Sequence, residues 1–243
     1  MKMKKILSWS SGKDAAYTLH QLNLKGQKPD MLLTTVNKDF QRVSMHGLRI
    51  SLLEKQAENL GLPLYQIPLA KDVDMETYNQ LMRQHLTILK NQGIQTVIFG
   101  DIFLEDLKAY RIKQMSAINM LTEFPIWGND TRQLAQKIIQ SGIKAIVVST
   151  NAKYLDQSFV GRAFDKDFLR DLPDNVDWCG ENGEFHTFVY DSPEFIKAID
   201  FDLGEKTYKE YKPCSKKDQN HYRKNVKNTN WDTGFWYIDV IAK

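Results

Sequence analysis

The chain has 243 residues, of which 42% are hydrophobic and 26% charged, and its 33 basic and 30 acidic side chains leave a net charge of +3. This length supports a large buried core in one or two domains, and so balanced a charge does not favour a nucleic-acid-binding function. No apolar run reaches the roughly 20 residues of a membrane span, and no signal peptide is expected. The two cysteines make no disulfide framework. The sequence therefore predicts a cytoplasmic protein without a membrane partner.

The first half of the sequence alternates short apolar runs with longer amphipathic segments. Strands are expected at residues 5–9, 31–36, 64–69 and 96–99, and helices at residues 14–25, 48–60 and 75–91. Repeated strand–helix alternation with short connections predicts an α/β fold, in which a parallel, Rossmann-like sheet has helices on both faces.

Ligands of such a sheet bind beyond the carboxyl ends of the strands, where the strand order reverses. Three segments therefore deserve examination: residues 10–14 after the first strand, 36–37 after the second, and Gly100-Asp101 after the fourth.

The second half of the sequence begins at residues 124–127 with FPIW, and its pattern differs from that of the first half. A helix is expected at residues 131–140, a strand at 145–149, and a polar segment, WCGENGEFHTFVYD, follows at 178–191. Its Asn182-Gly183 pair predicts a tight turn with positive φ, and the strand after the turn places Glu184 and His186 on one face. We therefore predict one domain at 1–124, which contains the parallel sheet, and a smaller α+β domain at 125–243.

The loop after the first strand reads Ser10, Ser11, Gly12, Lys13 and Asp14. Backbone N–H groups, hydroxyls, a lysine and the positive end of the following helix together form an anion site. Asp14 fits such a site if it caps the helix or receives Mg²⁺ that accompanies a polyphosphate. A plain capped strand–helix turn is the alternative.

The sequence SSGKDA at this loop resembles the SGGxDS pyrophosphate loop of the ATP pyrophosphatases. Within that superfamily the chain is similar to the diphthine–ammonia ligase-related family, in particular to its bacterial branch. The resemblance runs nearly end to end, in the blocks LLTTVN (32–37), SMHGLR (44–49), FGDIFLEDLKAYR (99–111), FPIWG (124–128), GRAFDKDFL (161–169) and CGENGEFHTFVYDSPEF (179–195). The chain departs from the family pattern at Ser11, which replaces a glycine, at Ala15, at Lys113 and at Asn182.

The resemblance implies an adenine nucleotide alpha-hydrolase-like fold and a ligase reaction. In that reaction ATP adenylates a carboxylate, pyrophosphate leaves, and ammonia displaces AMP to give an amide. The implied ligands are ATP, Mg²⁺, ammonia and a carboxylate-bearing small molecule or modified protein side chain, and a homodimer is a reasonable expectation for the class.

The resemblance also implies roles for individual residues. Asp14 and Asp101 are candidate Mg²⁺ ligands, and together with Arg111 they are candidate catalytic residues. The nucleotide would be held by Ser10, Ser11, Gly12, Lys13, Asp14, Thr34, Val36, His46, Gly47 and Gly100.

The GENGEFHTF block supplies the candidate acceptor site. Glu184 or His186 is expected to handle the proton of ammonium, because a carboxylate or an imidazole among aromatic residues suits general acid–base chemistry. Substrate binding is assigned to Glu181, Asn182, Gly183, Glu184 and Thr187. A solvent-exposed β-hairpin is the structural alternative.

Two other functions are weighed against the ligase. A nucleotide-sensing protein would bind ATP without joining anything, but it would give the GENGEFHTF block no purpose. A tRNA-modifying enzyme of the thiolation or lysidine type would share the adenylation step, but thiolation usually requires a pair of positioned thiols, which Cys179 and Cys214 do not resemble.

Overall fold

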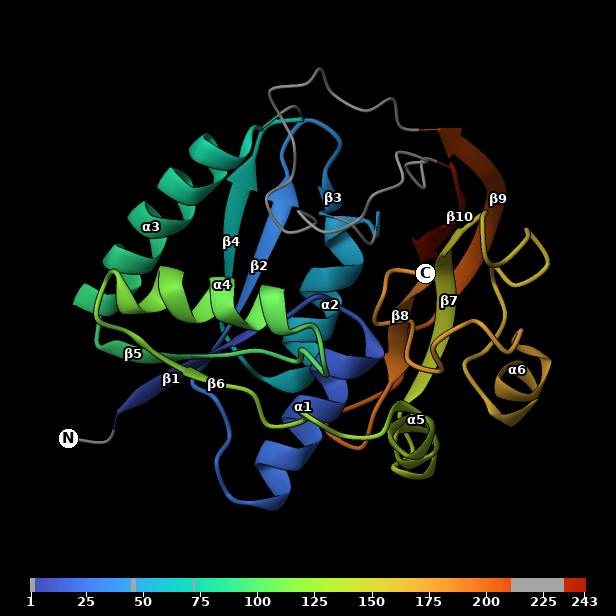
Figure 1. Cartoon of the computed structure of the whole chain (residues 1–243), viewed down its shortest axis with the longest axis horizontal. Coiled ribbons are helices and arrows are strands. Elements are labelled where there is room, and N and C mark those ends of the chain that lie inside the picture. Colours follow the sequence, from blue (N-terminus) through green and yellow to red (C-terminus); the bar gives the residue numbers. More distant parts are fainter. Residues whose placement is uncertain (1–2, 45–46, 72, 211–233) are drawn as a thin grey trace.

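The computed structural model describes residues 3–44, 47–71, 73–210 and 234–243. The chain folds into two sheets with helices packed around and between them (Figure 1). Among the described helices, none has the length and apolar character that crossing a membrane requires.

The first sheet is built from the first half of the chain. Its parallel strands lie in the order β4 (Leu64–Leu69), β2 (Met31–Asn37), β1 (Lys4–Ser8), β5 (Ile94–Ile98) and β6 (Leu121–Glu123). The short β3 (Arg42–Val43) runs antiparallel to the end of β2. The chain builds outward from β1 to β4 on one side and then from β5 to β6 on the other, so the strand order reverses between β1 and β5. The predicted parallel, Rossmann-like sheet is confirmed.

Helices cover both faces of this sheet because successive strand residues point to opposite sides. Ile6 packs in a cluster with residues of α3 (Met75–Asn91) and α4 (Glu105–Ser116), which lie on one face. Its neighbour Leu7 packs in the cluster that holds α1 (Lys13–Leu24) and α2 (Ile50–Leu60) on the other face.

The second sheet is antiparallel and comes from the second half of the chain. Its strands lie in the order β8 (Phe185–Asp191), β7 (Lys144–Asn151), β10 (Gly234–Ala242) and β9 (Phe201–Glu210). The helices α5 (Thr131–Gln140) and α6 (Lys166–Asp171) complete this half. This sheet with its two helices agrees with the predicted smaller α+β part.

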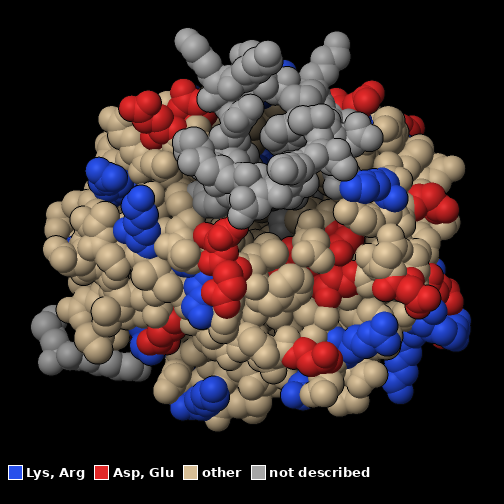
Figure 2. Space-filling model, viewed as in Figure 1, with Lys and Arg blue, Asp and Glu red and all other residues tan. Residues whose placement is uncertain are grey.

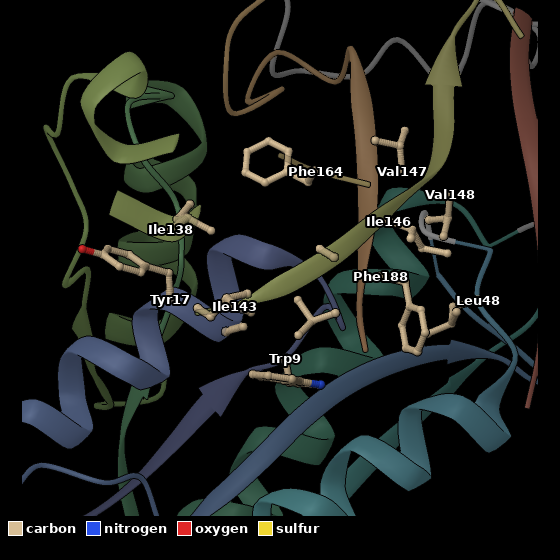
Figure 3. Close-up of a cluster of buried hydrophobic side chains, with 14 of the residues drawn as sticks. Trp9, Tyr17, Leu48, Ile138, Ile143, Ile146, Val147, Val148, Phe164 and Phe188 are labelled. Carbon is tan, nitrogen blue, oxygen red and sulfur yellow. The ribbon is translucent and has the colours of Figure 1, made fainter. Parts of the chain in front are cut away.

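The two halves share one hydrophobic core. Trp9, which follows β1, and Phe188 of β8 belong to the same cluster of buried side chains (Figure 3). α1 contacts β8 and α5, and α2 contacts β10. The second sheet therefore packs on the α1–α2 side of the first sheet, so residues far apart in sequence can share a site.

Several elements carry too weak a pattern for sequence-based prediction. The helix α4 buries only Met115 among its 12 residues, so it shows no apolar stripe. The strands β3 and β6 have two and three residues, which is too short for an alternating pattern. The strands β9 and β10 and the helix α6 were also not predicted.

Candidate active site

The loops that follow β1 and β5 meet at the reversal of strand order. Gly100 lies against the first turn of α1: a Cβ built there would stand 3.1 Å from Thr18 Oγ1 and 3.2 Å from the backbone carbonyl of Asp14. The Thr18 hydroxyl itself donates to that carbonyl at 2.8 Å. A larger residue would crowd this contact, so glycine favours the close approach of the loop after β5 to the predicted pyrophosphate loop.

Ser11 has φ +73°, the left-handed conformation that a glycine would adopt more easily. This explains why the family loop usually has glycine here. Ser11 is buried, and its hydroxyl has no hydrogen-bond partner among the residues that the structure describes. Its carbonyl accepts hydrogen bonds from Val189 N at 3.0 Å and Gln56 Nε2 at 3.1 Å, so β8 and α2 together hold the strained residue.

Gln56 is a residue of this site that the sequence did not reveal. Its fully buried side-chain amide donates to the carbonyls of Ser11 and Val189 and accepts from Trp9 Nε1 at 2.9 Å. It therefore joins the loop after β1 to β8. A glutamine in an amphipathic helix ordinarily faces solvent, and no local pattern distinguishes this one.

Lys13 lies where the two halves of the chain meet, and only 1% of its surface is exposed. Its ammonium donates to both carboxylate oxygens of Asp14 and to the carbonyl of Cys179, and it lies over the rings of Phe164 and Phe185. Burial, the largest single effect, lowers the pKa of Lys13, but Asp14, Cys179 and Glu181 together outweigh it and hold that pKa above its ordinary value. This ammonium thus has a full set of internal partners.

Asp101 and Arg111 form an ion pair with two hydrogen bonds. Arg111 Nε lies 2.5 Å from one carboxylate oxygen and Nη2 lies 3.1 Å from the other. The guanidinium stands over the ring of Phe99 at 4.3 Å. The ion pair therefore holds Arg111 at the end of β5, next to Asp101.

The segment that carries GENGE makes a compact turn rather than a two-residue hairpin. Gly180 and Gly183 have φ of +67° and +89°, and a Cβ at Gly180 would stand 2.9 Å from the ring and carbonyl of Phe185. Asp177 accepts hydrogen bonds from the N–H groups of Cys179 and Glu181. The expected positive φ occurs at Gly183, while Asn182 stays outside the left-handed region.

The two acids of this turn point to different places. Glu181 reaches to the loop after β5, where its Oε1 accepts from Ile102 N at 2.8 Å and Phe103 N at 3.4 Å. Glu184 is 2% exposed, and its Oε1 accepts from Asp177 N and from Asn182 Nδ2 within the turn itself. His186 is half-buried and lies opposite Ser149 of β7.

Thr187, an expected substrate ligand, contacts the pyrophosphate loop. Its Oγ1 accepts a hydrogen bond from Lys13 N at 3.1 Å.

Thr34, an expected nucleotide ligand, uses its buried hydroxyl to donate to the carbonyl of Trp9 at 2.6 Å. Val36 is a buried core residue, and the space beside Gly47 is bounded by the ring of Tyr237. His46 lies outside the described residues.

A shallow polar hollow of about 290 Å³ opens beside the turn. Arg132, at the start of α5, stacks over the ring of Trp178 at 5.1 Å on its wall. The other lining residues are Thr131, Asp174, Asn175, Val176, Asp177 and Asn182.

The two candidate metal ligands form ion pairs with basic side chains. Asp14 pairs with Lys13, and Asp101 pairs with Arg111. Within the described ranges, no three His, Cys, Asp or Glu side chains gather in a way that could hold a metal ion. The protein side chains alone thus do not form a fitting metal site.

Comparison with known proteins identifies the family to which the chain is similar. Residues 3–118 match the family model of a diphthamide synthase N-terminal domain, and residues 130–221 match that of a diphthamide synthase C-terminal domain. A diphthine–ammonia ligase of Bos taurus is 26% identical over 227 residues, and one of Mus musculus is 27% identical over 221 residues. Each alignment covers 81% of this chain and 82% of the relative.

Proposed function

We propose that this chain, which belongs to the diphthine–ammonia ligase-related family, is an ATP-dependent ligase that joins ammonia to a carboxylate. The observation that carries the proposal is the direct contact between the pyrophosphate loop and the GENGEFHTF block. Thr187 accepts from Lys13 N, and Val189 N donates to the carbonyl of Ser11. This contact supports a single site for nucleotide and acceptor, as a two-step ligase requires.

In the first step a carboxylate oxygen of the acceptor attacks the α-phosphorus of ATP, and pyrophosphate leaves. The backbone N–H groups at the start of α1 suit the phosphate oxygens. Preorganised donors of this kind stabilise charge that develops in the transition state, and each contributes roughly 10²–10³ in rate.

In the second step ammonia attacks the carbonyl carbon of the acyl-adenylate. The carbon–nitrogen bond forms, the bond to the AMP oxygen breaks, and AMP leaves with the electron pair. Glu181 and the hollow beside Asn182 lie on the acceptor side of the loop, so we assign the acceptor to this region. Diphthine, the acid named in the relatives, is the first candidate acceptor.

The two sheets have separate roles in the proposed reaction. We propose that residues 1–124 bind ATP and that residues 125–243 bind the acceptor. Asp14 and Asp101 stay candidate carboxylates for Mg²⁺ that arrives with ATP, but no step of the proposed reaction depends on them as ligands.

The test is to identify the nucleotide product. The protein is incubated with ATP, Mg²⁺, ammonium and a diphthine-containing peptide, alongside a panel of small carboxylates and a reaction without carboxylate. AMP and pyrophosphate that require the carboxylate support the ligase. ADP and phosphate would overturn adenylation, and tight ATP binding without turnover would favour nucleotide sensing.

A further inference from the structure

Three side chains near the turn could exchange a proton with ammonium: Glu181, Glu184 and His186. A base for this step must present a free lone pair where a small cation can reach it. The environments of the two carboxylates differ in this respect.

Glu184 is enclosed. One carboxylate oxygen is occupied by the N–H of Asp177 and the side-chain amide of Asn182. The other oxygen is out of contact with solvent, and no donor in the described part of the chain bonds to it. Glu184 therefore braces the turn, and its carboxylate is not placed to meet a solute.

Glu181 has one oxygen anchored and one oxygen open. Oε1 accepts from the N–H groups of Ile102 and Phe103, directly after Gly100 and Asp101. In the part of the chain that the structure describes, no donor contacts Oε2, and this atom is not among the enclosed ones. The anchored oxygen fixes the carboxylate at the reversal of strand order, and the second oxygen can accept a proton.

We infer that Glu181 takes the proton from ammonium and so delivers ammonia to the acyl-adenylate, an inference that rests on the proposed function. The carboxylate becomes a carboxylic acid, and the freed nitrogen lone pair forms the carbon–nitrogen bond as AMP leaves. The second proton of the new nitrogen group passes to water. Glu181 then returns its proton to solvent and is ready for the next turnover.

The charges that face Glu181 support this chemistry. Burial raises the pKa of Glu181 to about 7, the N–H of Ile102 opposes the shift, and Asp14 and Asp101 add to it while Lys13 opposes it. A carboxylate with a pKa near the working pH is a far better proton acceptor than an ordinary one.

The test compares two nucleophiles in the full-length protein. At neutral pH ammonia is mostly ammonium, whereas hydroxylamine is mostly unprotonated and needs no base to free its nitrogen. We expect Glu181→Gln, which keeps an oxygen for the N–H of Ile102, to lower ammonia-dependent amide formation about 100-fold. Hydroxamate formation from the same diphthine-containing peptide should fall far less, so the ratio of amide to hydroxamate should drop. Glu105→Gln, in the exposed first turn of α4, is the matched control.

The outcomes separate cleanly. An equal loss with both nucleophiles would make Glu181 a structural residue, and no loss with either would exclude it. If His186→Ala alone shows the selective loss, the role belongs to His186. If the parent protein forms no amide from the peptide, the proposed acceptor fails. A carbon-13 NMR titration of the Glu181 carboxyl then decides the inference, and ionisation well below neutral pH would overturn it.

Discussion

The hydroxyl of Thr187 accepts a hydrogen bond from the backbone N–H of Lys13, although the two residues are 174 positions apart. This N–H belongs to the first turn of α1, where intrahelical partners are lacking. A side chain of β8 therefore caps the helix that begins at the pyrophosphate loop. The second half of the chain thus helps to shape the proposed nucleotide site of the first half.

Thr187→Val removes this acceptor with little change in shape. The buried N–H of Lys13 then lacks a partner, so the free energy of unfolding should fall by about 1–3 kcal/mol. ATP binding should weaken while adenosine binding is retained, because only the phosphates meet the loop. Denaturant unfolding and calorimetric titration measure both effects. Thr207→Val, exposed on β9, is the control, and equal behaviour of the two variants would contradict the capping role.

Gly100→Ala should disturb the same turn from the opposite side. The added methyl group would stand about 3 Å from the Asp14 carbonyl and Thr18 Oγ1, and backbone atoms cannot rotate away. We expect a loss of about 1–3 kcal/mol in the free energy of unfolding. Thr18→Ala in addition should recover only part of this, because the Asp14 carbonyl stays in place. Full recovery in the double variant would show that the side chain alone makes the contact.

The arrangement of strands was accessible from the sequence because a buried parallel sheet leaves a clear alternation of apolar runs and helices. The strand ends then led to Ser10–Asp14 and Gly100-Asp101. The directions in which side chains point could not be predicted from the sequence. Gln56 gives no sign of its burial, and the turn contains Glu181 and Glu184 three residues apart with nothing in the local pattern to tell which one reaches the β5 loop. Contacts between the two sheets determine which way these side chains point.

Stability should depend on pH through Glu181. Burial raises its folded-state pKa from 4.5 to about 7, so between these values the folded protein holds the proton more firmly than the unfolded chain. This contribution is fully present below about pH 4.5 and is lost as the pH rises through about 7, by at most about 3 kcal/mol. Unfolding curves of the parent and of Glu181→Gln should therefore differ in pH slope across this window. Parallel slopes would mean that Glu181 is ionised throughout it.

Lys13→Met tests whether this lysine serves the phosphates or the junction between the halves. Its ammonium is 1% exposed and is shared by the Asp14 carboxylate and the Cys179 carbonyl. Removal of one partner of a buried ion pair leaves the other charge uncompensated, so we expect a loss of about 3–5 kcal/mol in the free energy of unfolding. Thermal and denaturant unfolding measure this loss, with Lys25→Met at the exposed end of α1 as the control.

A second substitution identifies the cause of that loss. Lys13→Met combined with Asp14→Asn removes the stranded carboxylate, so the double variant should be more stable than Lys13→Met alone. If Lys13 chiefly bound phosphate, the single variant would keep the stability of the parent and lose only ATP affinity. The deep burial of the ammonium between Phe164 and Phe185 argues for the first outcome, because a group so enclosed must move before it can reach a nucleotide.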